Sequence, residues 1–272
     1  MNLPVEQVEL IRNRWRRTRK ALHLTDPSAE DFGTGGLVAL APEVCVRLLV
    51  LPGDPEGIPL PEFDTTFWEW WCRERPNPFQ GTRPTDWGSQ RKPTVDAAVR
   101  YRPHDSEPWR WDTYLALHRN GAMEFGLGEE GSARWAHRAG EGERRAFFLV
   151  SIVGRVWVAI ALYGEVLTQY EIQGPWEVSL ALRQTRDALL GNVAAGWKDF
   201  QDWFPRDAPT CPHPNLLVRR EVGAWPTGDG ARDLAFALGA TVEDAWGITD
   251  RRFLIRPDQP GGGEFDVSRY GG

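Results

Sequence analysis

Two pairs of carboxylates near the end of the sequence have the side chains that acid–base or metal chemistry needs. Glu243 and Asp244 are adjacent, and Glu264 and Asp266 lie two positions apart. Clustered carboxylates bind divalent cations or act as general acid and base. At the end of a predicted helix, however, Glu243 and Asp244 oppose the helix dipole, and an arginine pair follows closely enough to neutralise them. We therefore expect a structural ion-pair cluster, with a catalytic or metal-binding carboxylate group as the alternative.

The segment "RNRWRRTRK", residues 12–20, is a candidate for phosphate binding. It belongs to a predicted helix over 5–23, in which apolar residues recur every three or four positions and the basic residues occupy the other sides. Such a helix either binds nucleic acid or simply exposes a solvated face, and both interpretations fit the pattern. The predicted nucleic-acid-binding residues are Arg12, Arg16, Arg17, Arg19 and Lys20.

Two further motifs resemble ligand sites without the context that such sites require. The sequence "GLGEEG" places glycines at Gly126, Gly128 and Gly131, but a dinucleotide-binding pattern must follow a strand and open a helix. In "CPHP", Cys211 and His213 resemble half of a zinc site, yet no second ligand pair has a suitable spacing. We therefore predict no metal and no cofactor, and no catalytic residue can be assigned.

The composition is typical of a soluble globular protein. The 272 residues are 41% hydrophobic and 26% charged, and the net charge of −6 argues against extensive coating of nucleic acid but permits a confined basic patch. Three scattered cysteines without a CxxC, and an N-terminus without a secretory leader, predict a cytoplasmic location. The apolar run 146–164 carries Arg155 near its middle, so we expect a buried core segment and no membrane contact.

Periodicity and turn residues predict an α+β fold, with a mixed or antiparallel sheet, packed helices and an irregular segment rich in proline and tryptophan. The clearest local feature is a hairpin over 113–128, in which Asn120-Gly121 suits a two-residue type I′ turn. The other predicted elements are a strand in "EVCVRLLVLPGDP", a buried helix over 152–169, strands over 174–183 and 214–222, and a helix over 228–247 capped by Asp229 and stopped by Gly247.

Frequent prolines exclude long helices from residues 53–110, apart from a short one around "TTFWEWWCRER". The predicted division is therefore 1–110, with the basic helix and this irregular region, and 111–272, an α+β domain; one continuous domain is the alternative. The tryptophans of the irregular region are expected to be packing anchors, with a binding surface as the other possibility. They are Trp68, Trp70, Trp71, Trp109 and Trp111. In the long helix we expect burial of Val150, Val153, Trp157, Ile160 and Ala161.

The blocks "GPWEVSLALRQTRDALLG", "CPHPNLLVRREVGAW", "LAFALGATVEDAWG", "RRFL" and "EFDVSRY" share their spaced aromatics and glycines with a known type of region. Over roughly residues 113–270 the chain resembles the region that follows the Schlafen-type AlbA domain in actinobacterial-style proteins. That resemblance implies an accessory or C-terminal-type module beside a nucleic-acid machine, in antiviral defence. Several family members cut RNA through clustered carboxylates, but that catalytic core is not found in this sequence and no catalytic residue carries over.

These observations predict a non-enzymatic binding or scaffolding module of a nucleic-acid-linked or antiviral-defence assembly, with a protein partner and with nucleic acid contacted through the basic helix. The alternative is a hydrolase or nuclease whose carboxylate site forms only in three dimensions, from residues such as Glu243 and Asp266. Convergence of three or more carboxylates in a cleft would favour the enzyme.

Overall fold

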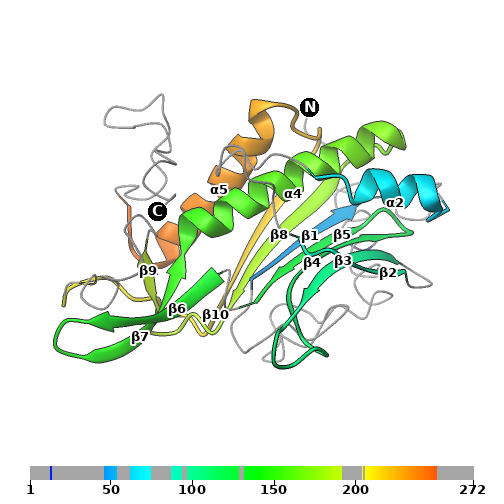
Figure 1. The fold of residues 1–272 in the computed structure, drawn as a ribbon. Helices are drawn as coiled ribbons and strands as arrows, with labels where there is room; N and C mark the ends of the chain where they lie inside the picture. The colour runs from blue at the N-terminus through cyan, green and yellow to red at the C-terminus, as the bar shows by residue number, and fades with distance from the viewer. Residues whose placement is uncertain are drawn as a thin grey trace.

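The α+β fold predicted from the sequence is the fold of the chain, with a mostly antiparallel sheet and helices on one of its faces (Figure 1). The structure is a computed structural model that describes residues 46–53, 62–74, 87–93, 97–128, 132–191 and 206–249, together with Asn13 and Phe204.

The larger sheet of the described region has seven strands, and every neighbouring pair is antiparallel. Its order is β10-β8-β1-β5-β4-β3-β2, so β1, from before residue 111, lies between two strands from after it. The predicted boundary between 110 and 111 therefore lies inside this sheet. The strands are β1 Val46–Pro52, β2 Gln90–Pro93, β3 Ala97–Pro103, β4 Trp111–His118, β5 Met123–Leu127, β8 Trp176–Arg183 and β10 Asn215–Val222.

One face of this sheet forms the main core. Alternate residues of β1, such as Leu48 and Val50, join Phe125 of β5 and Leu180 of β8 in a single buried apolar cluster with the helices. Because side chains alternate between the faces of a strand, the intervening residues lie on the opposite face. The helices are α2 Thr65–Trp71, α4 Leu149–Gln169 and α5 Asp229–Ala245, of which α4 and α5 pack against each other (Figure 1).

Helix α4 confirms the predicted buried helix and begins three residues earlier, at Leu149. Val150, Val153 and Ile160 are buried as expected. Trp157, in contrast, is only half-buried, although it packs against the main core, and Ala161 is exposed. By length and composition α4 could cross a membrane, but most of it is buried inside the protein, as is usual for the core helix of a soluble domain.

The predicted hairpin is present as β4 and β5, but its turn is not type I′. Leu117 pairs with Met123, and the His118 amide donates to the Ala122 carbonyl, which leaves a loop of three residues. The φ angle of Gly121 is 79°, whereas Asn120 does not have the positive φ that a type I′ turn requires at both positions. The structure instead has a turn followed by a left-handed glycine, the common solution for a three-residue hairpin loop.

Strands β2 and β3 lie in the segment that was predicted to be irregular. Their pairing places Lys92 opposite Val99 and Gln90 opposite Tyr101 at one edge of the sheet. All four residues of β2 are exposed and it carries two basic side chains and a proline, so neither hydrophobicity nor alternation indicates a strand. Charged side chains and proline are typical of edge strands, which gives a physical reason for the wrong prediction.

A second, smaller sheet has the order β6-β7-β9 and was not predicted. Its strands are β6 Ala133–Arg138, β7 Gly142–Phe148 and β9 Leu189–Gly191, and β7 runs antiparallel to β6 but parallel to β9. In Figure 1 the β6–β7 hairpin extends beyond the larger sheet. It leads directly into α4, so the hairpin is fixed at its base by the core helix.

The ends of α5 confirm one predicted signal and correct another. Gly247, with a φ of 73°, stops the helix: its amide donates to the Asp244 carbonyl, and the Ile248 amide donates to the Glu243 carbonyl, which is the Schellman arrangement. Asp229 is not the N-cap. Gly228 takes that position without a side-chain hydrogen bond, and Asp229 is the first helical residue.

Candidate functional site

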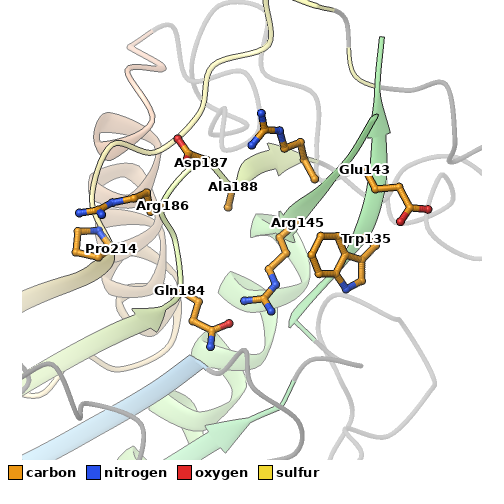
Figure 2. A pocket seen from close by; sticks show the side chains of 9 residues that line it. Trp135, Glu143, Arg145, Gln184, Arg186, Asp187, Ala188 and Pro214 are labelled. Atoms are coloured by element: carbon orange, nitrogen blue, oxygen red, sulfur yellow. The ribbon is translucent and has the colours of Figure 1, made fainter. Parts of the chain in front are cut away.

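A pocket of about 440 Å³ opens between the β6–β7 hairpin and the segment 184–188, which joins β8 to β9 (Figure 2). Its volume is within the range of about 300–1,000 Å³ that is usual for small-ligand sites. The hairpin contributes an aromatic ring and three charged side chains, and the joining segment contributes two more. The lining residues are Trp135, Glu143, Arg144, Arg145, Gln184, Arg186, Asp187, Ala188 and Pro214.

Trp135 and Arg145 form the hairpin side of the pocket. They are directly opposite each other in the β6–β7 register, and the Arg145 guanidinium carbon lies 5.2 Å from the centre of the Trp135 ring. Trp135 is 55% exposed, which is unusual for so large an apolar side chain. A partly exposed indole with a stacked guanidinium offers a flat surface and a positive charge at the same point.

The other side of the pocket is a segment held rigidly by the chain before β10. The Asp187 amide donates to the Cys211 carbonyl, and the Thr185 hydroxyl donates to the His213 carbonyl at 2.7 Å. The Gln184 amide donates to Asn215 Oδ1. These hydrogen bonds hold Gln184 and Asp187 at φ values of 55° and 60°, in a conformation that residues other than glycine adopt at some cost.

A buried tryptophan at the end of α5 also holds this segment in place. Trp246, at the end of α5, is 2% exposed, and its indole Nε1 donates to the Ala188 carbonyl at 2.7 Å. The C-terminus of α5 therefore contacts the pocket lining directly. Both walls of the pocket are thus fixed, one by α4 and the other by α5 and the 211–215 segment.

The pocket is positively charged within an acidic protein. Three arginines line it, against the two acids Glu143 and Asp187, and Arg144 also pairs with Glu141 at 3.5 Å; the whole chain carries a net charge of −6. Arg186, Asp187 and Glu143 are exposed, so their charges reach solvent. Concave surfaces concentrate the field of such groups, and the arginines can therefore attract an anionic ligand.

The predicted carboxylate candidates are only partly within the described region. Glu243 is fully buried on α5, whereas its neighbour Asp244 is exposed, so the two side chains do not share one site. Glu264 and Asp266 lie outside the described residues, as do the basic residues Arg12, Arg16, Arg17, Arg19 and Lys20. Among the residues that the structure describes, no group of three or more histidine, cysteine, aspartate or glutamate side chains is arranged to hold a metal ion.

The tryptophans singled out in the sequence are mostly packing anchors. Trp71 and Trp111 are buried, and Trp68 and Trp70 are half-buried against the main core. Only Trp109 of that group is exposed, at 68%. Cys211 of the "CPHP" motif is buried, and its carbonyl accepts the hydrogen bond from the Asp187 amide in the 184–188 segment. The motif therefore has a structural role.

A buried polar cluster occupies the face of the large sheet opposite α4 and α5. Glu124 is 1% exposed; the Tyr114 hydroxyl donates to its Oε1, and His118 Nε2 lies 3.6 Å from its Oε2. Burial by itself raises the pKa of the Glu124 carboxyl, but His118, the charge of Arg47 and the Tyr114 hydroxyl together outweigh burial and hold this pKa below its usual value. The cluster thus keeps a carboxylate ionised inside the sheet.

None of the pocket residues was singled out for binding by the sequence. Trp135 belongs to "SARWAHRAGEGERR", which is polar and broken by glycines. The available signal was alternation: Trp135 and His137 are two apart on one face of β6, and Glu143 and Arg145 lie opposite them on β7. Comparison with protein-family models, with curated proteins and with solved structures found no match to this chain.

Proposed function

We propose that the protein is a non-enzymatic binding module of a nucleic-acid-linked assembly, and that the pocket of Trp135 is its ligand site. The single observation that carries this proposal is the pair formed by the exposed Trp135 ring and the guanidinium of Arg145, 5.2 Å away, within a pocket that two further arginines line. A setting in antiviral defence is supported by the sequence resemblance alone.

Single-stranded nucleic acid has the two features that this pair recognises. Its bases stack on exposed aromatic rings and its phosphates attract arginine, and the two contacts together are the usual basis of binding without strong sequence preference. An acidic peptide would satisfy the arginines but has no need of the indole. The ring is therefore the feature that favours nucleic acid over a purely acidic partner.

Binding is favoured over hydrolysis because two of the candidate acids do not share a site. Glu243 and Asp244 lie in different environments, one buried and one exposed. In this proposal any chemical step belongs to a protein partner, and the module contributes the recognition of a nucleic-acid ligand. The basic segment around Arg16 adds a second, electrostatic contact.

Fluorescence anisotropy with labelled single-stranded RNA and DNA of about twelve nucleotides tests the proposal at low salt. Trp135→Ala removes the stacking surface and should weaken binding by about 1–3 kcal/mol. Arg145→Gln should weaken it as well, because a phosphate is deprived of its charged partner. Trp109→Ala is the matched control, since it removes the other exposed tryptophan of the described region, 68% exposed and outside the pocket.

Two results would contradict the proposal. One is a parent protein that binds neither oligonucleotide at low salt. The other is an equal loss of affinity in Trp135→Ala and Trp109→Ala, which would mean that the pocket is not where the strand binds. A glutamate homopolymer that competes as well as the oligonucleotide would show recognition of charge without stacking, and would point to an acidic protein partner instead.

A further inference from the structure

The pocket offers one stacking surface and three arginines on its two walls. Trp135 is the single aromatic residue among those that line it, and its arginines are confined to positions 144, 145 and 186. Proteins that track along a strand use a basic groove and several aromatic rings, with sites of about 4–16 nucleotides. One ring with three arginines matches a much shorter unit.

Acidic residues flank these arginines on both walls. Glu143 directly precedes Arg144 on the hairpin, and Asp187 directly follows Arg186 on the opposite segment. A strand that continued through the pocket would bring successive phosphates past these carboxylates, and like charges at short range repel. A ligand with a single terminal phosphate can instead place it among the arginines and keep the rest of its surface neutral.

The remaining polar groups of the lining suit the neutral parts of a nucleotide. The Gln184 side-chain oxygen is buried, has no hydrogen-bond partner and lines the pocket. It can accept a hydrogen bond from a base amine or a sugar hydroxyl, and the carboxylates of Glu143 and Asp187 accept from the same donors. Because Gln184 and Asp187 are fixed by hydrogen bonds on both sides of Arg186, these acceptors are organised before a ligand arrives.

From these features we infer that the pocket binds one nucleotide that carries a terminal phosphate, and does not bind the interior of a strand. The base stacks on Trp135, the phosphate binds Arg145 beside the ring, and the acids of the rim repel further phosphates. This inference rests on the proposed function, since it specifies the ligand of the same site. A free mononucleotide and the phosphorylated end of a strand share this chemistry.

Oligonucleotides that differ in length and in their terminal phosphate distinguish binding of one phosphorylated nucleotide from general binding of single strands. The probes are adenosine and uridine monophosphates, the dinucleotides ApA and UpU with and without a phosphate at either end, and twelve-nucleotide strands with the same ends. The probes are compared on a variant with Arg12, Arg16, Arg19 and Lys20 changed to glutamine, because the basic segment would add affinity that depends on strand length. In this variant a phosphorylated dinucleotide should bind within a few-fold of the phosphorylated twelve-mer. Removal of the terminal phosphate should weaken both at least tenfold, because the ligand then loses its charge-assisted contact with Arg145. The log–log dependence of affinity on salt should have a slope of about −0.7 to −1.4, as for the one or two negative charges of a terminal phosphate.

The outcomes are distinct. Affinity that grows steadily with strand length and ignores the terminal phosphate would overturn the inference and leave the proposed function intact. No binding by any probe would overturn both. Mononucleotides that bind as tightly as phosphorylated strands would identify the free nucleotide as the ligand; mononucleotides that bind at least tenfold more weakly than phosphorylated dinucleotides would identify a strand end.

A charge-neutral variant tests the discriminating role of the acids. Glu143→Gln together with Asp187→Asn keeps the shapes of both side chains, and asparagine tolerates the left-handed backbone at 187. Binding of the unphosphorylated twelve-mer should improve. The ratio of the affinities for the phosphorylated and the unphosphorylated twelve-mer should therefore fall toward one. Glu62→Gln together with Glu69→Gln, at two exposed positions outside the pocket, controls for the same change in net charge. An unchanged preference in the double variant would contradict the inference.

Discussion

The aromatic ring of Tyr114 lies directly over Gly126 of the neighbouring strand, so that a Cβ built at Gly126 would overlap the ring. This close approach brings the Tyr114 hydroxyl to Glu124, two residues along β5. The glycine that matched a nucleotide-binding pattern in the sequence is therefore needed for packing within the sheet. It allows a fully buried tyrosine to reach a fully buried carboxylate.

Gly126→Ala should destabilise the protein by about 1–3 kcal/mol, because the added methyl group must displace a ring that is packed in the sheet. Chemical denaturation followed by circular dichroism measures the change. Gly223→Ala is the matched control: no atom lies within 4 Å of a Cβ at that position, and its backbone has no positive φ. Equal stabilities for Gly126→Ala and Gly223→Ala would contradict the packing account.

Glu124 should make the stability of the protein depend on pH in the acid range. Its pKa is lower in the folded protein than in the unfolded chain, so the folded state favours the ionised form. The resulting stabilisation is fully present above the unfolded pKa, near 4.3, and is lost as the pH falls through the folded pKa. Glu124→Gln should be less stable than the parent at pH 7, and the difference should shrink as the pH falls below about 4.

Urea denaturation of both proteins at a series of pH values between 7 and 3 measures that difference. Glu69→Gln, an exposed glutamate on α2, controls for the removal of one negative charge. A constant difference between Glu124→Gln and the parent across this range would mean that the charge of Glu124 does not contribute to stability.

The elements that sequence patterns predicted are those whose residues carry their own local signal. Helix α4 is a long apolar run, and β4 and β5 flank a residue pair that favours a tight turn. The turn type differed because Asn120-Gly121 suits more than one hairpin loop, and the pairing of Leu117 with Met123 selects the longer one. Register is a property of a pair of strands, and the sequence of neither strand alone determines it.

The candidate site was not predictable for the same reason. Trp135 and Arg145 are neighbours only through the β6–β7 pairing, and Arg186 reaches the same pocket because β9 lies parallel to β7. A tryptophan in a polar sequence also gives no sign of its exposure: Trp246 is 2% exposed and Trp135 is 55% exposed. Tertiary packing decides which of the tryptophans is exposed.

The basic segment of residues 12–20 should contribute affinity that depends on strand length, in contrast to the pocket. A variant with Arg12, Arg16, Arg19 and Lys20 changed to glutamine should bind long single strands more weakly and with a flatter salt dependence, by about 0.7 in slope for each phosphate that the segment no longer neutralises. Its preference for a terminal phosphate should be unchanged, because the pocket arginines remain. Anisotropy across a salt series measures both quantities, and identical slopes for parent and variant would reduce the segment to a solvated helix face.

Trp246 should act as a positioning residue for the pocket. Trp246→Phe keeps an aromatic ring in the core but removes the hydrogen bond to the Ala188 carbonyl, and it should cost about 1–2 kcal/mol of stability. The Cys211 amide still donates to that carbonyl, so the 184–188 segment should stay folded but be held less firmly against α5. We expect the affinity for a terminally phosphorylated dinucleotide to fall several-fold, since Ala188 and Asp187 line the pocket.

Phe236→Leu, at a buried position of the same helix, provides a comparable decrease in stability without touching this hydrogen bond. If the two variants are destabilised equally but only Trp246→Phe binds more weakly, the indole positions the ligand site. Equal affinities in both variants would mean that Trp246 contributes only to the packing of the core.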